Sequence, residues 1–339
     1  MKATIYDVAK QAGVSIATVS KVINQTGRIS EETRAKVNRI MQELNYQPSV
    51  VASALTGKQT FTLGLLLPDL ANPFFAEIAR SVEDRAHELG FSVMICSTDN
   101  NLLREERNIS LLKQKSVDGI IIATGVRNDA ILKDLKKQNF PVALIARDMP
   151  SMAIDTVLVD DFIGGHMAAS HLIEQGHRQI AVIAEDTLVM SSQERIRGYR
   201  FALEEAGIAY NPELVRISDF KVTDAKQVAG EMLDAPEPPT AIFACNDLLA
   251  TGVIQAVRER GLSVPGDLSV VGFDNTLLAT IIDPPLTTVA QPIQEMGQKV
   301  VDLIIRIIND KNSTKQRIVM LPELVIRSSV SRPGEYRNK

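Results

Sequence analysis

The chain has 339 residues, of which 45% are hydrophobic and 23% are charged. This length predicts two or three domains at roughly 150 residues each, and the composition excludes a disordered or fibrous protein. No apolar run approaches the roughly 18 residues of a membrane helix, and the start (MKATIYDVAKQ) contains no apolar signal core. We therefore expect a cytoplasmic protein without a membrane partner.

The net charge of −4 is unevenly distributed along the chain. Residues 1–60 contain eight Lys and Arg residues against four Asp and Glu residues, so this segment carries +4 and the remaining 279 residues carry −8. A small basic segment on a large acidic body is typical of a protein in which one domain contacts a polyanion such as DNA.

The amino-terminal segment predicts three short helices. Thr4 followed by Asp7 is typical of a capping box, and Gly13 is suited to end the first helix in a left-handed conformation. Ser15 and Ser30 are expected to cap the second and third helices, whose apolar residues recur at helical spacing. Two short helices separated by a glycine-containing turn and braced by a third form a helix-turn-helix. A small helical domain with a solvated face is the alternative.

One face of the second predicted helix is not explained by burial. Its buried stripe is formed by Val19, Val22 and Ile23. The residues that face away from this stripe, toward the place of a DNA major groove, are Ile16, Ala17, Ser20 and Lys21.

Residues 4–23 (TIYDVAKQAGVSIATVSKVI) resemble the DNA-binding head of the LacI family of bacterial transcription regulators. Residues 45–59 (NYQPSVVASALTGKQ) resemble the hinge segment of that family, and the resemblance extends through nearly the whole chain. Within the family it favours the DegA-type regulators of Gram-positive bacteria. It implies a repressor that binds a two-fold DNA operator as a homodimer and is switched by a small-molecule effector. A leucine-heptad tail, which makes some relatives tetrameric, is not found, so we expect a dimer.

The resemblance also implies which residues contact DNA. Ile16, Ala17 and Lys21 would meet base edges, and Lys21 stands where the family more often has arginine or histidine, which leaves the operator sequence open. Phosphate contacts are expected from Thr4, Tyr6, Ser15, Thr18, Ser20, Asn24 and Thr33. Capping or packing is an equally good role for three of these residues, Thr4, Ser15 and Thr18.

The hinge is expected to form a helix of about two turns at residues 49–56, which is marginal in isolation. It would order when it pairs with its two-fold mate on DNA. Leu55 occupies the place of the leucine that the family inserts into the minor groove, where an apolar wedge kinks the duplex. Packing of Leu55 on the body is the alternative. Ser53 replaces an arginine that is frequent in the family.

From Phe61 onward, short apolar runs alternate with helical stretches. The expected strands are residues 61–67, 91–97, 117–123, 141–146, 156–159, 179–184, 214–218, 240–245 and 268–273. Runs that are apolar throughout and separated by helices indicate parallel sheets covered on both faces. Two such series predict an α/β body of two Rossmann-like subdomains. The resemblance adds a periplasmic-binding-protein-like connection, in which the chain crosses between the subdomains near Asp160, Gln291 and Leu321.

These expectations divide the chain into three parts. A helix-turn-helix domain would span residues 1–47, a hinge helix and linker residues 48–60, and an effector-binding and dimerisation domain residues 61–339. Within the last, subdomain one would comprise about 61–160 and 292–320, and subdomain two about 161–291 and 321–339.

Ligands of open α/β sheets bind beyond the carboxyl ends of the strands, here facing each other across a cleft. The effector contacts expected at these ends are Phe74, Phe75, Arg147, Arg195, Asn246 and Asp274. We expect Phe74 to be the more exposed aromatic ring and Asp247 to cap the helix that follows it. A structural ion pair between Arg195 and Asp274 is the alternative to effector binding.

A carboxylate, a guanidinium and an amide suit the vicinal hydroxyls of a sugar or the edges of a purine. A sugar or sugar derivative is therefore the expected effector, and a purine is the alternative. A second alternative keeps the regulator but replaces the small molecule with a phosphorylated carrier protein that docks on the first subdomain. Whether the effector induces or co-represses is left open by the sequence.

Other protein classes fit less well. The body has no G-x-G-x-x-G after a strand, no P-loop and no H-E-x-x-H, and its four histidines lack ligand spacing, so no catalytic residue, cofactor or metal is expected. A transport binding protein would leave the basic head unexplained. Cys96 and Cys245 each lie in an apolar run that predicts a buried strand, and no disulfide is expected.

Overall fold

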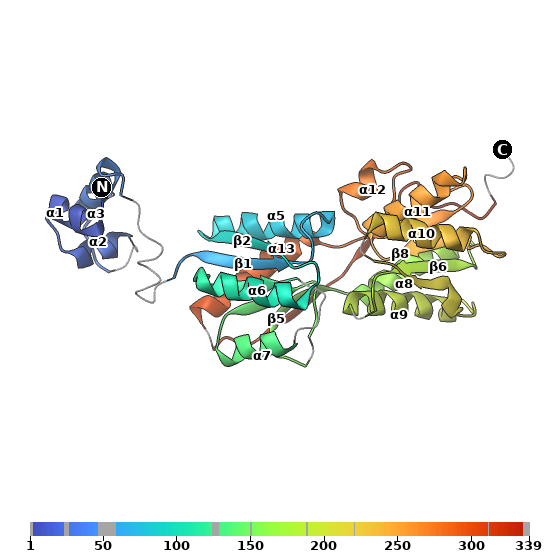
Figure 1. The fold of residues 1–339 in the computed structure, drawn as a ribbon, viewed down its shortest axis with the longest axis horizontal. Coiled ribbons are helices and arrows are strands. Elements are labelled where there is room, and N and C mark those ends of the chain that lie inside the picture. Colours follow the sequence, from blue (N-terminus) through green and yellow to red (C-terminus); the bar gives the residue numbers. More distant parts are fainter. Residues whose placement is uncertain are drawn as a thin grey trace. The chain divides into compact units, whose positions relative to one another are not determined.

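The computed structural model describes residues 3–23, 27–46, 59–123, 129–149, 151–187, 189–219, 221–310 and 312–334. The chain divides into two units, Met1–Thr60 and Phe61–Lys339 (Figure 1). The expected hinge helix with Ser53 and Leu55, and the expected phosphate contact Asn24, lie outside the described residues.

The first unit is a three-helix domain built from α1 (Ile5–Ala12), α2 (Ile16–Ile23) and α3 (Glu31–Glu43). All three helices contribute buried side chains to one apolar core, namely Val8, Ala9, Ala12, Val19, Val22, Val37 and Ile40. Gly13 ends α1 at φ 66°, a left-handed conformation that allows the sharp turn into α2. This is the predicted helix-turn-helix.

Side-chain hydrogen bonds define where these helices begin. The backbone N–H and the hydroxyl of Thr4 both donate to Asp7 Oδ2, at 2.9 and 2.7 Å. Ser15 Oγ accepts from the Thr18 N–H at 3.1 Å, and Ser30 Oγ accepts from the Thr33 N–H at 3.3 Å. Each contact satisfies a group that the first turn of a helix leaves without an intrahelical partner.

The body begins with a six-stranded sheet in the order β11-β5-β4-β3-β1-β2, in which all strands are parallel. Its strands are β1 (Thr62–Leu67), β2 (Ser92–Ser97), β3 (Gly119–Ile122), β4 (Val142–Ile145), β5 (Asp155–Val159) and β11 (Arg317–Met320). Cys96 is only half-buried because β2 is an edge strand with several exposed side chains, whereas Cys245 is buried.

The second sheet repeats this arrangement in the order β12-β10-β9-β8-β6-β7. Its strands are β6 (Ile180–Ala184), β7 (Val215–Ile217), β8 (Ala241–Ala244), β9 (Ser269–Asp274), β10 (Thr287–Ala290) and β12 (Glu323–Val325). They are parallel except for β12, which is antiparallel to β10. The chain passes between the sheets after β5, after β10 and after β11.

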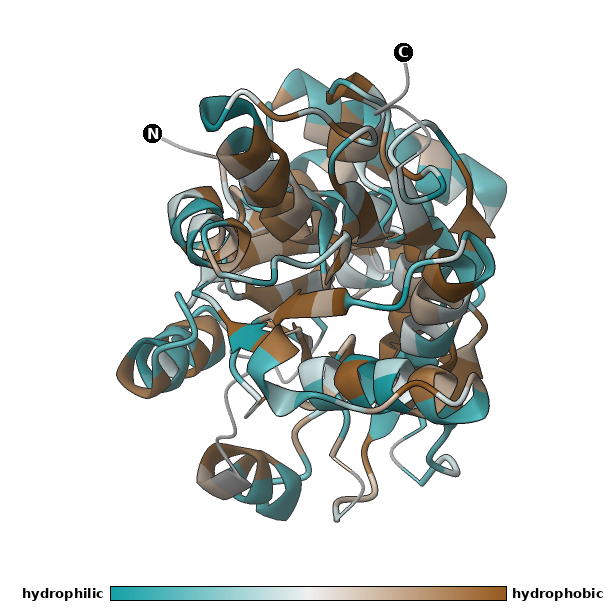
Figure 2. Ribbon diagram, turned by 90° about the vertical axis from the view of Figure 1, so that its right-hand side faces the viewer, coloured by the Kyte–Doolittle hydropathy of each residue, from teal (hydrophilic) through white to brown (hydrophobic). Residues whose placement is uncertain are grey.

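Helices cover both faces of each sheet, as Figure 2 shows, with apolar strands inside and polar residues on the outer helix surfaces. The first sheet is covered by α5 (Pro73–Glu88), α6 (Leu102–Gln114), α7 (Asp129–Lys137) and α13 (Ile293–Asn309). The second is covered by α8 (Asp161–Glu174), α9 (Met190–Glu205), α10 (Val222–Leu233) and α11 (Asp247–Glu259), with the short helices η1 (Pro212–Leu214) and α12 (Leu277–Ile281) in its connections. In the part of the chain that is described, no helix is long and apolar enough to span a membrane.

Strand alternation explains the two layers of core. In β1, Leu65 and Leu67 join the buried cluster formed with α5 and α13, whereas Leu66 joins the cluster formed with α6 and α7. Because successive side chains of a strand point to opposite faces, a strand covered on both faces must be apolar throughout. The predicted fold class, a helix-turn-helix head with an α/β body of two parallel-sheet subdomains, is confirmed.

Three strands, β10, β11 and β12, were not predicted. Each lies at or next to a sheet edge and is short or polar. In β10, Thr287 and Thr288 are fully buried because their hydroxyls are hydrogen-bonded, to the Arg327 N–H and to Asp247 Oδ1 respectively. A search for apolar runs does not find strands whose polar side chains are satisfied internally.

Candidate functional site

A cavity of about 50 Å³ lies where the carboxyl ends of both sheets face each other. Subdomain one lines it with Pro68, Asn72, Phe74, Phe75, Asn100, Ala123, Ala146 and Val159. Subdomain two lines it with Asp161, Glu185, Val189, Ser191, Arg195, Asn246, Asp274 and Gln291. Five of the six predicted effector residues are among them, and Arg147 is not.

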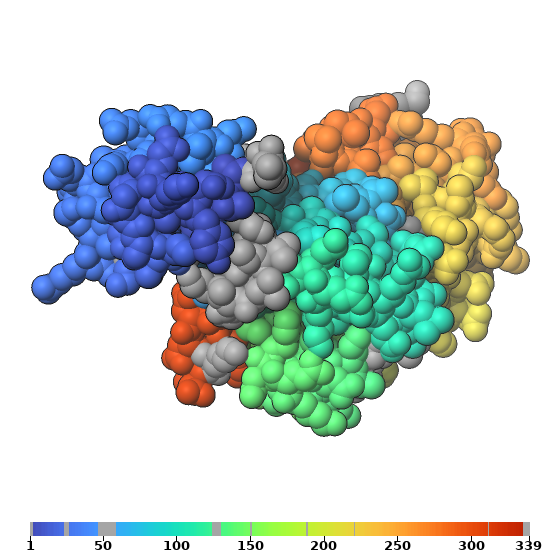
Figure 3. All heavy atoms as spheres, turned by 60° about the vertical axis from the view of Figure 1, so that its left-hand side comes forward, coloured from blue at the N-terminus to red at the C-terminus, as the bar shows by residue number. Residues whose placement is uncertain are grey.

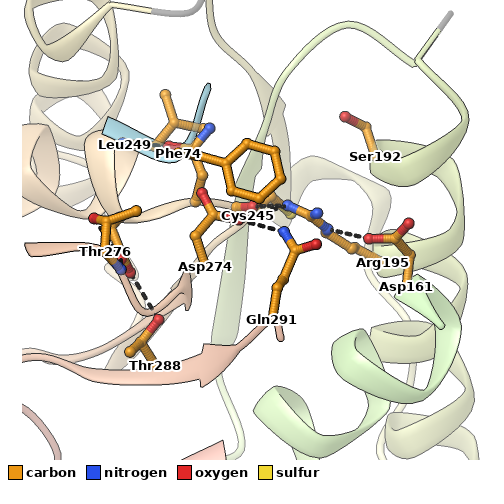
Figure 4. Close-up of polar contacts among 12 residues, drawn as sticks. Phe74, Asp161, Ser192, Arg195, Cys245, Leu249, Asp274, Thr276, Thr288 and Gln291 are labelled. Atoms are coloured by element: carbon orange, nitrogen blue, oxygen red, sulfur yellow. Dashed lines mark hydrogen bonds and ion pairs between the residues drawn. The ribbon is translucent and has the colours of Figure 1, made fainter. Parts of the chain in front are cut away.

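Arg195 of α9 lies at the centre of the polar side chains (Figure 4). Its Nε donates to Asp161 Oδ1 at 2.8 Å, and its Nη1 donates to the backbone carbonyl of Cys245. Nη1 also lies 3.9 Å from Asp274 Oδ1, and the guanidinium carbon lies 3.6 Å from the centroid of the Phe273 ring. The side chain is therefore fixed on several sides at once.

Glycines explain how Arg195 reaches this position. A Cβ on Gly198 would lie 2.1 Å from the Phe162 carbonyl oxygen, and a Cβ on Gly165 would lie 2.1 Å from the Arg195 carbonyl oxygen. A Cβ on Gly164 would lie 2.6 Å from the Phe273 ring. Because Gly165 and Gly198 have no side chain, α8 and α9 pack backbone to backbone, and Gly164 lets α8 approach Phe273 of β9. That close packing brings Asp161 beside Arg195.

Burial dominates the electrostatics of this cluster. It raises the pKa of Asp161 and raises that of Asp274 well above the ordinary aspartate range, although the Arg195 charge opposes both shifts. Burial alone would lower the pKa of Arg195, but the nearby charges of Asp161, Asp274 and Glu185 raise it above its ordinary value. A permanent cation is thus surrounded by carboxyl groups that are costly to ionise.

A second set of polar contacts lies next to Arg195. Glu185 follows β6, and its carboxylate accepts hydrogen bonds from Ser192 Oγ at 2.9 Å and from Asn246 Nδ2. Asn246 Oδ1 accepts from the Leu249 N–H at 2.7 Å and so caps α11. Asn246 therefore has both a capping role and a place in the cavity wall.

Gln291 leaves one hydrogen-bond acceptor in the cavity wall. Its Nε2 donates to Asp274 Oδ1 at 2.7 Å, whereas its buried Oε1 has no partner among the described residues. The backbone here is strained as well, because the lining residues Asn100, Ala146 and Asp274 have φ values of 50°, 51° and 106°. Backbone of this kind costs on the order of 1 kcal/mol per residue and is concentrated at ligand sites.

Asp247 does not cap α11, contrary to the prediction, since Asn246 does. Its buried carboxylate instead accepts hydrogen bonds from the Thr276 N–H at 2.7 Å, the Thr276 hydroxyl at 3.0 Å and the Thr288 hydroxyl at 2.7 Å. Burial raises the pKa of Asp247 to about 6, and these hydrogen bonds limit the shift. Asp247 thus ties the loop after β9 to β10, behind the cavity wall.

The two phenylalanines at the start of α5 are equally buried, so the expectation that Phe74 is the more exposed is wrong. Phe74 is 7% exposed and Phe75 is 8% exposed, and both line the cavity. Asn72 caps α5 by accepting from the Phe74 N–H at 3.1 Å, with Pro73 at the first helical position. The ring centroids of Phe74 and Phe75 are 5.1 Å apart in an edge-on arrangement, and both rings pack against the core.

Arg147 is held away from the Arg195 cluster. It is 6% exposed, and its Nη1 lies 3.3 Å from Glu105 Oε1 of α6, which is buried with it. Arg147 borders a larger hollow beside the cavity, of about 560 Å³.

Sequence reasoning missed several residues that line the cavity, among them Asp161, Glu185 and Gln291. Asp161 and Glu185 closely follow β5 and β6, which were both expected, so the strand-end argument already pointed to them. Gln291 directly follows β10, a strand that was not expected. The mid-helix Gly-Gly pair at 164–165 was a further signal, because such a pair marks close backbone approach.

In the first unit, the predicted base-contacting residues form an exposed strip on α2. Ile16 is 40% exposed, and Ala17 and Lys21 are exposed beside it. Tyr6 on α1 is 69% exposed, whereas Thr18, Ser20 and Thr33 are half-buried. The hydroxyls of Thr4, Ser15 and Thr18 are engaged in the caps described above or with each other.

Comparison with known proteins gives consistent matches. Residues 4–49 match the bacterial regulatory proteins of the lacI family, and residues 169–330 match the periplasmic binding protein-like domain. The HTH-type transcriptional regulator DegA of Bacillus subtilis (strain 168) is 50% identical over 98% of this chain and 99% of its own length.

Two solved structures resemble the whole chain. One is the lac repressor dimer bound to operator and the anti-inducer ONPF, which is 32% identical with a TM-score of 0.86 and covers 98% of this chain and 100% of its own. The other is the complex of the transcriptional regulator CelR with cellobiose, which is 32% identical with a TM-score of 0.75 and covers 96% of this chain and 99% of its own.

Proposed function

The chain belongs to the LacI family of bacterial regulatory proteins, and from that premise we propose that it is a transcription repressor controlled by a sugar-like effector. The helix-turn-helix binds a two-fold DNA operator, and the effector binds in the cleft between the subdomains. The observation that carries the proposal is the buried cluster around Arg195, in which donors and acceptors from several strand ends converge on one cavity.

On DNA, Ile16, Ala17 and Lys21 meet base edges in the major groove. Their exposure on one face of α2 supports this role, since an apolar residue such as Ile16 is 40% exposed without a packing reason. Thr4, Tyr6, Ser15, Thr18, Ser20, Asn24 and Thr33 contact phosphates and set the register. Residues 48–60 form the hinge, and Leu55 enters the minor groove.

The cavity chemistry supports a sugar effector. Arg195 donates, Asp274 and Gln291 Oε1 accept, and Asn246 does both, which matches neighbouring hydroxyls that are each donor and acceptor. Phe74 and Phe75 supply an apolar surface for a sugar face. The CelR complex with cellobiose, a relative of similar fold, is consistent with this class. Arg147 acts at the rim.

Closure of the cleft is the switch. The 50 Å³ cavity is far smaller than the roughly 300–1,000 Å³ of typical small-molecule sites, so an effector must part or rearrange the two walls to enter. A change in the angle between the subdomains moves the point where the hinge enters β1. The two hinge segments then meet and fold on DNA, or fail to, which is an order–disorder transition.

An apolar surface supports a dimer. Large apolar side chains are exposed on α12 and at the starts of α5 and α6, namely Leu70, Leu102, Leu103, Leu277 and Ile281, with exposures from 44% to 74%. Glu77 Oε1 of α5 accepts from the Leu277 N–H at 3.2 Å, so α12 and α5 lie side by side (Figure 3). Exposed apolar side chains on neighbouring elements of both subdomains are typical of a protein interface.

Selection of random DNA duplexes by the full-length protein tests the DNA-binding part. The proposal predicts enrichment of a two-fold symmetric sequence, and Leu55→Ser then lowers the affinity for that sequence while effector binding is retained. Enrichment of an asymmetric sequence, or full operator affinity in Leu55→Ser, would contradict the dimer or the hinge assignment respectively.

A thermal-shift screen of sugars, sugar phosphates and purines tests the effector class, because a ligand that binds the folded state raises its melting temperature. Sugars are predicted to stabilise the protein. Stabilisation by purines alone would replace the sugar assignment with a purine, and a response only to a phosphorylated carrier protein would move the input from the cleft to the surface of subdomain one.

A further inference from the structure

We propose that the effector is an uncharged oligosaccharide of two or more rings, which extends from the cavity along α9. This inference rests on the proposed function and adds the length and charge of the ligand. The inference is based on two hollows beside the cavity that Arg195 does not line.

The first hollow adjoins the cavity. It measures about 560 Å³ and shares five lining residues with the cavity, namely Ala146, Val159, Asp161, Val189 and Ser191. The cavity alone, at about 50 Å³, falls below the roughly 300–1,000 Å³ of typical small-molecule sites, whereas the hollow lies within that range. Most of the space for a ligand therefore lies outside the Arg195 cluster.

The second hollow prolongs the first along α9. It measures about 400 Å³ and shares Phe162 and Arg197 with the first, while Arg200, Phe201 and Glu204 complete its lining. Arg197, Arg200, Phe201 and Glu204 are spaced three to four residues apart or adjacent, so they form one face of α9. The cavity and the two hollows adjoin one another through these shared wall residues and are here together called the α9 track.

Aromatic rings and planar donors line this track at intervals. The Phe162 and Phe201 ring centroids are 5.7 Å apart, and the Arg197 guanidinium carbon lies 4.5 Å from the Phe162 centroid. Phe201 is 43% exposed, and its ring centroid also lies 5.7 Å from that of His166. An aromatic face packs against the apolar face of a sugar ring, and an exposed guanidinium such as that of Arg197 donates to adjacent hydroxyls.

The two hollows carry no excess of positive charge, which argues against a phosphorylated ligand. Together they are lined by the five carboxylates of Asp148, Asp160, Asp161, Glu194 and Glu204 and by the four guanidiniums of Arg147, Arg197, Arg200 and Arg317. Each of these arginines has a carboxylate partner, for example Glu194 at 2.6 Å from Arg197 and Asp148 at 2.7 Å from Arg317. A phosphate would meet no uncompensated positive charge, whereas neutral hydroxyls can bond to both members of each pair.

Calorimetry on the full-length protein tests the length dependence. The probes are glucose with its β-1,4-linked and α-1,4-linked oligomers, and xylose with its β-1,4-linked oligomers, each from one to four rings. In the series that binds, Kd is expected to fall by about threefold or more per added ring up to three rings. A monosaccharide that binds as tightly as its oligomers would overturn the extended site and leave the sugar-controlled repressor intact.

Paired substitutions locate the extension. Arg197→Ala is expected to reduce the ratio of trisaccharide to monosaccharide affinity by about tenfold, because it removes a charged donor beyond the first ring. Arg216→Ala, at an exposed position on β7 of the same subdomain, is the control and should keep the wild-type ratio. An unchanged ratio in Arg197→Ala would place the additional rings elsewhere and overturn the α9 track. Absence of binding by every sugar in the three series would overturn the sugar class, and the extension with it.

Discussion

The two walls of the cleft come from sheets with equivalent strand orders, yet their side chains differ in kind. Subdomain one contributes apolar groups and two amides, with no charged side chain among its lining residues. Subdomain two contributes Arg195, Asp161, Glu185 and Asp274, together with the amides of Asn246 and Gln291. The same α/β arrangement has therefore placed charge on one side only.

This difference between the walls assigns polar recognition of the ligand to subdomain two and exclusion of water on cleft closure to subdomain one. The charged wall is already cross-linked by its own hydrogen bonds, so it keeps its geometry whether or not the walls are close together. The apolar wall contributes dehydration and shape when it comes close, and electrostatic interactions strengthen when water is excluded. Substitutions in the charged wall should consequently cost both stability and binding, and those in the apolar wall mainly binding.

The largest effect is expected from Arg195→Met. Without the guanidinium, the buried carboxyl groups of Asp161 and Asp274 lose their cation, and breaking a buried ion pair costs about 3 kcal/mol of unfolding free energy. Urea denaturation at pH 7 measures this loss, which should shrink as the pH falls because protonation neutralises the two carboxyl groups. Arg216→Met, on the exposed edge strand β7, should change stability by less than about 0.5 kcal/mol. Equal stability of the Arg195 variant and wild type would show that the cluster is not held by this cation.

The second-largest effect is expected from Gly198→Ala, which should lose about 2 kcal/mol of unfolding free energy. Its Cβ would meet the Phe162 carbonyl oxygen at 2.1 Å, a backbone atom that cannot rotate away, so α8 and α9 must separate and Arg195 must shift. Gly230→Ala in α10 is the matched control, because its Cβ meets only the flexible end of Arg260 and alanine favours the helix. Thermal melts and effector titrations of both variants check this. Similar losses in the two variants would remove the special role of the α8–α9 contact.

Phe74→Leu tests the apolar wall. We expect effector affinity to fall by about tenfold or less, since an aromatic contact contributes on the order of 1 kcal/mol. The polar contacts of the opposite wall with the effector should be retained. Calorimetry with the bound sugar should show this modest loss beside abolished binding in Arg195→Met. A loss as complete as that of Arg195→Met would mean that the two walls contribute equally.

The smallest expected effect is the pH dependence from Asp247, behind the charged wall. Its pKa in the folded state, about 6, is above the ordinary 3.8, so its contribution to stability is complete at low pH and is lost as the pH rises through 6. Between pH 5 and pH 7 the unfolding free energy of wild type should fall by about 1 kcal/mol more than that of Asp247→Asn. Parallel pH curves would show that Asp247 keeps an ordinary pKa.

The sequence predicts the fold well where burial alone determines the structure. Nine strands of the body were expected close to their observed positions. The inner strands among them are apolar because helices cover both of their faces, whereas β2 and β7 are edge strands with exposed side chains. The missed strand β10 is buried through hydrogen-bonded threonines, and hydrogen bonding of this kind depends on partners distant in the chain, such as Arg327 and Asp247.

The candidate site was only partly predictable for a related reason. The end of a strand locates a residue such as Asn246 or Asp274, but its partner depends on how two helices pack. Asp161 lies beside Arg195 because glycines let α8 and α9 pack closely, and Arg147 pairs with Glu105, a buried carboxylate on α6. Neither pairing follows from spacing along the chain.

The central claim is that ligand in the cleft controls the DNA-binding head. The most direct test measures how the sugar changes operator affinity and how operator DNA changes sugar affinity. Fluorescence anisotropy gives the operator affinity of the full-length protein with and without the sugar, and calorimetry gives the sugar affinity with and without operator DNA. The account predicts that both affinities change by the same factor, as thermodynamic linkage requires. A sugar that binds in the cleft yet leaves operator affinity unchanged would contradict it.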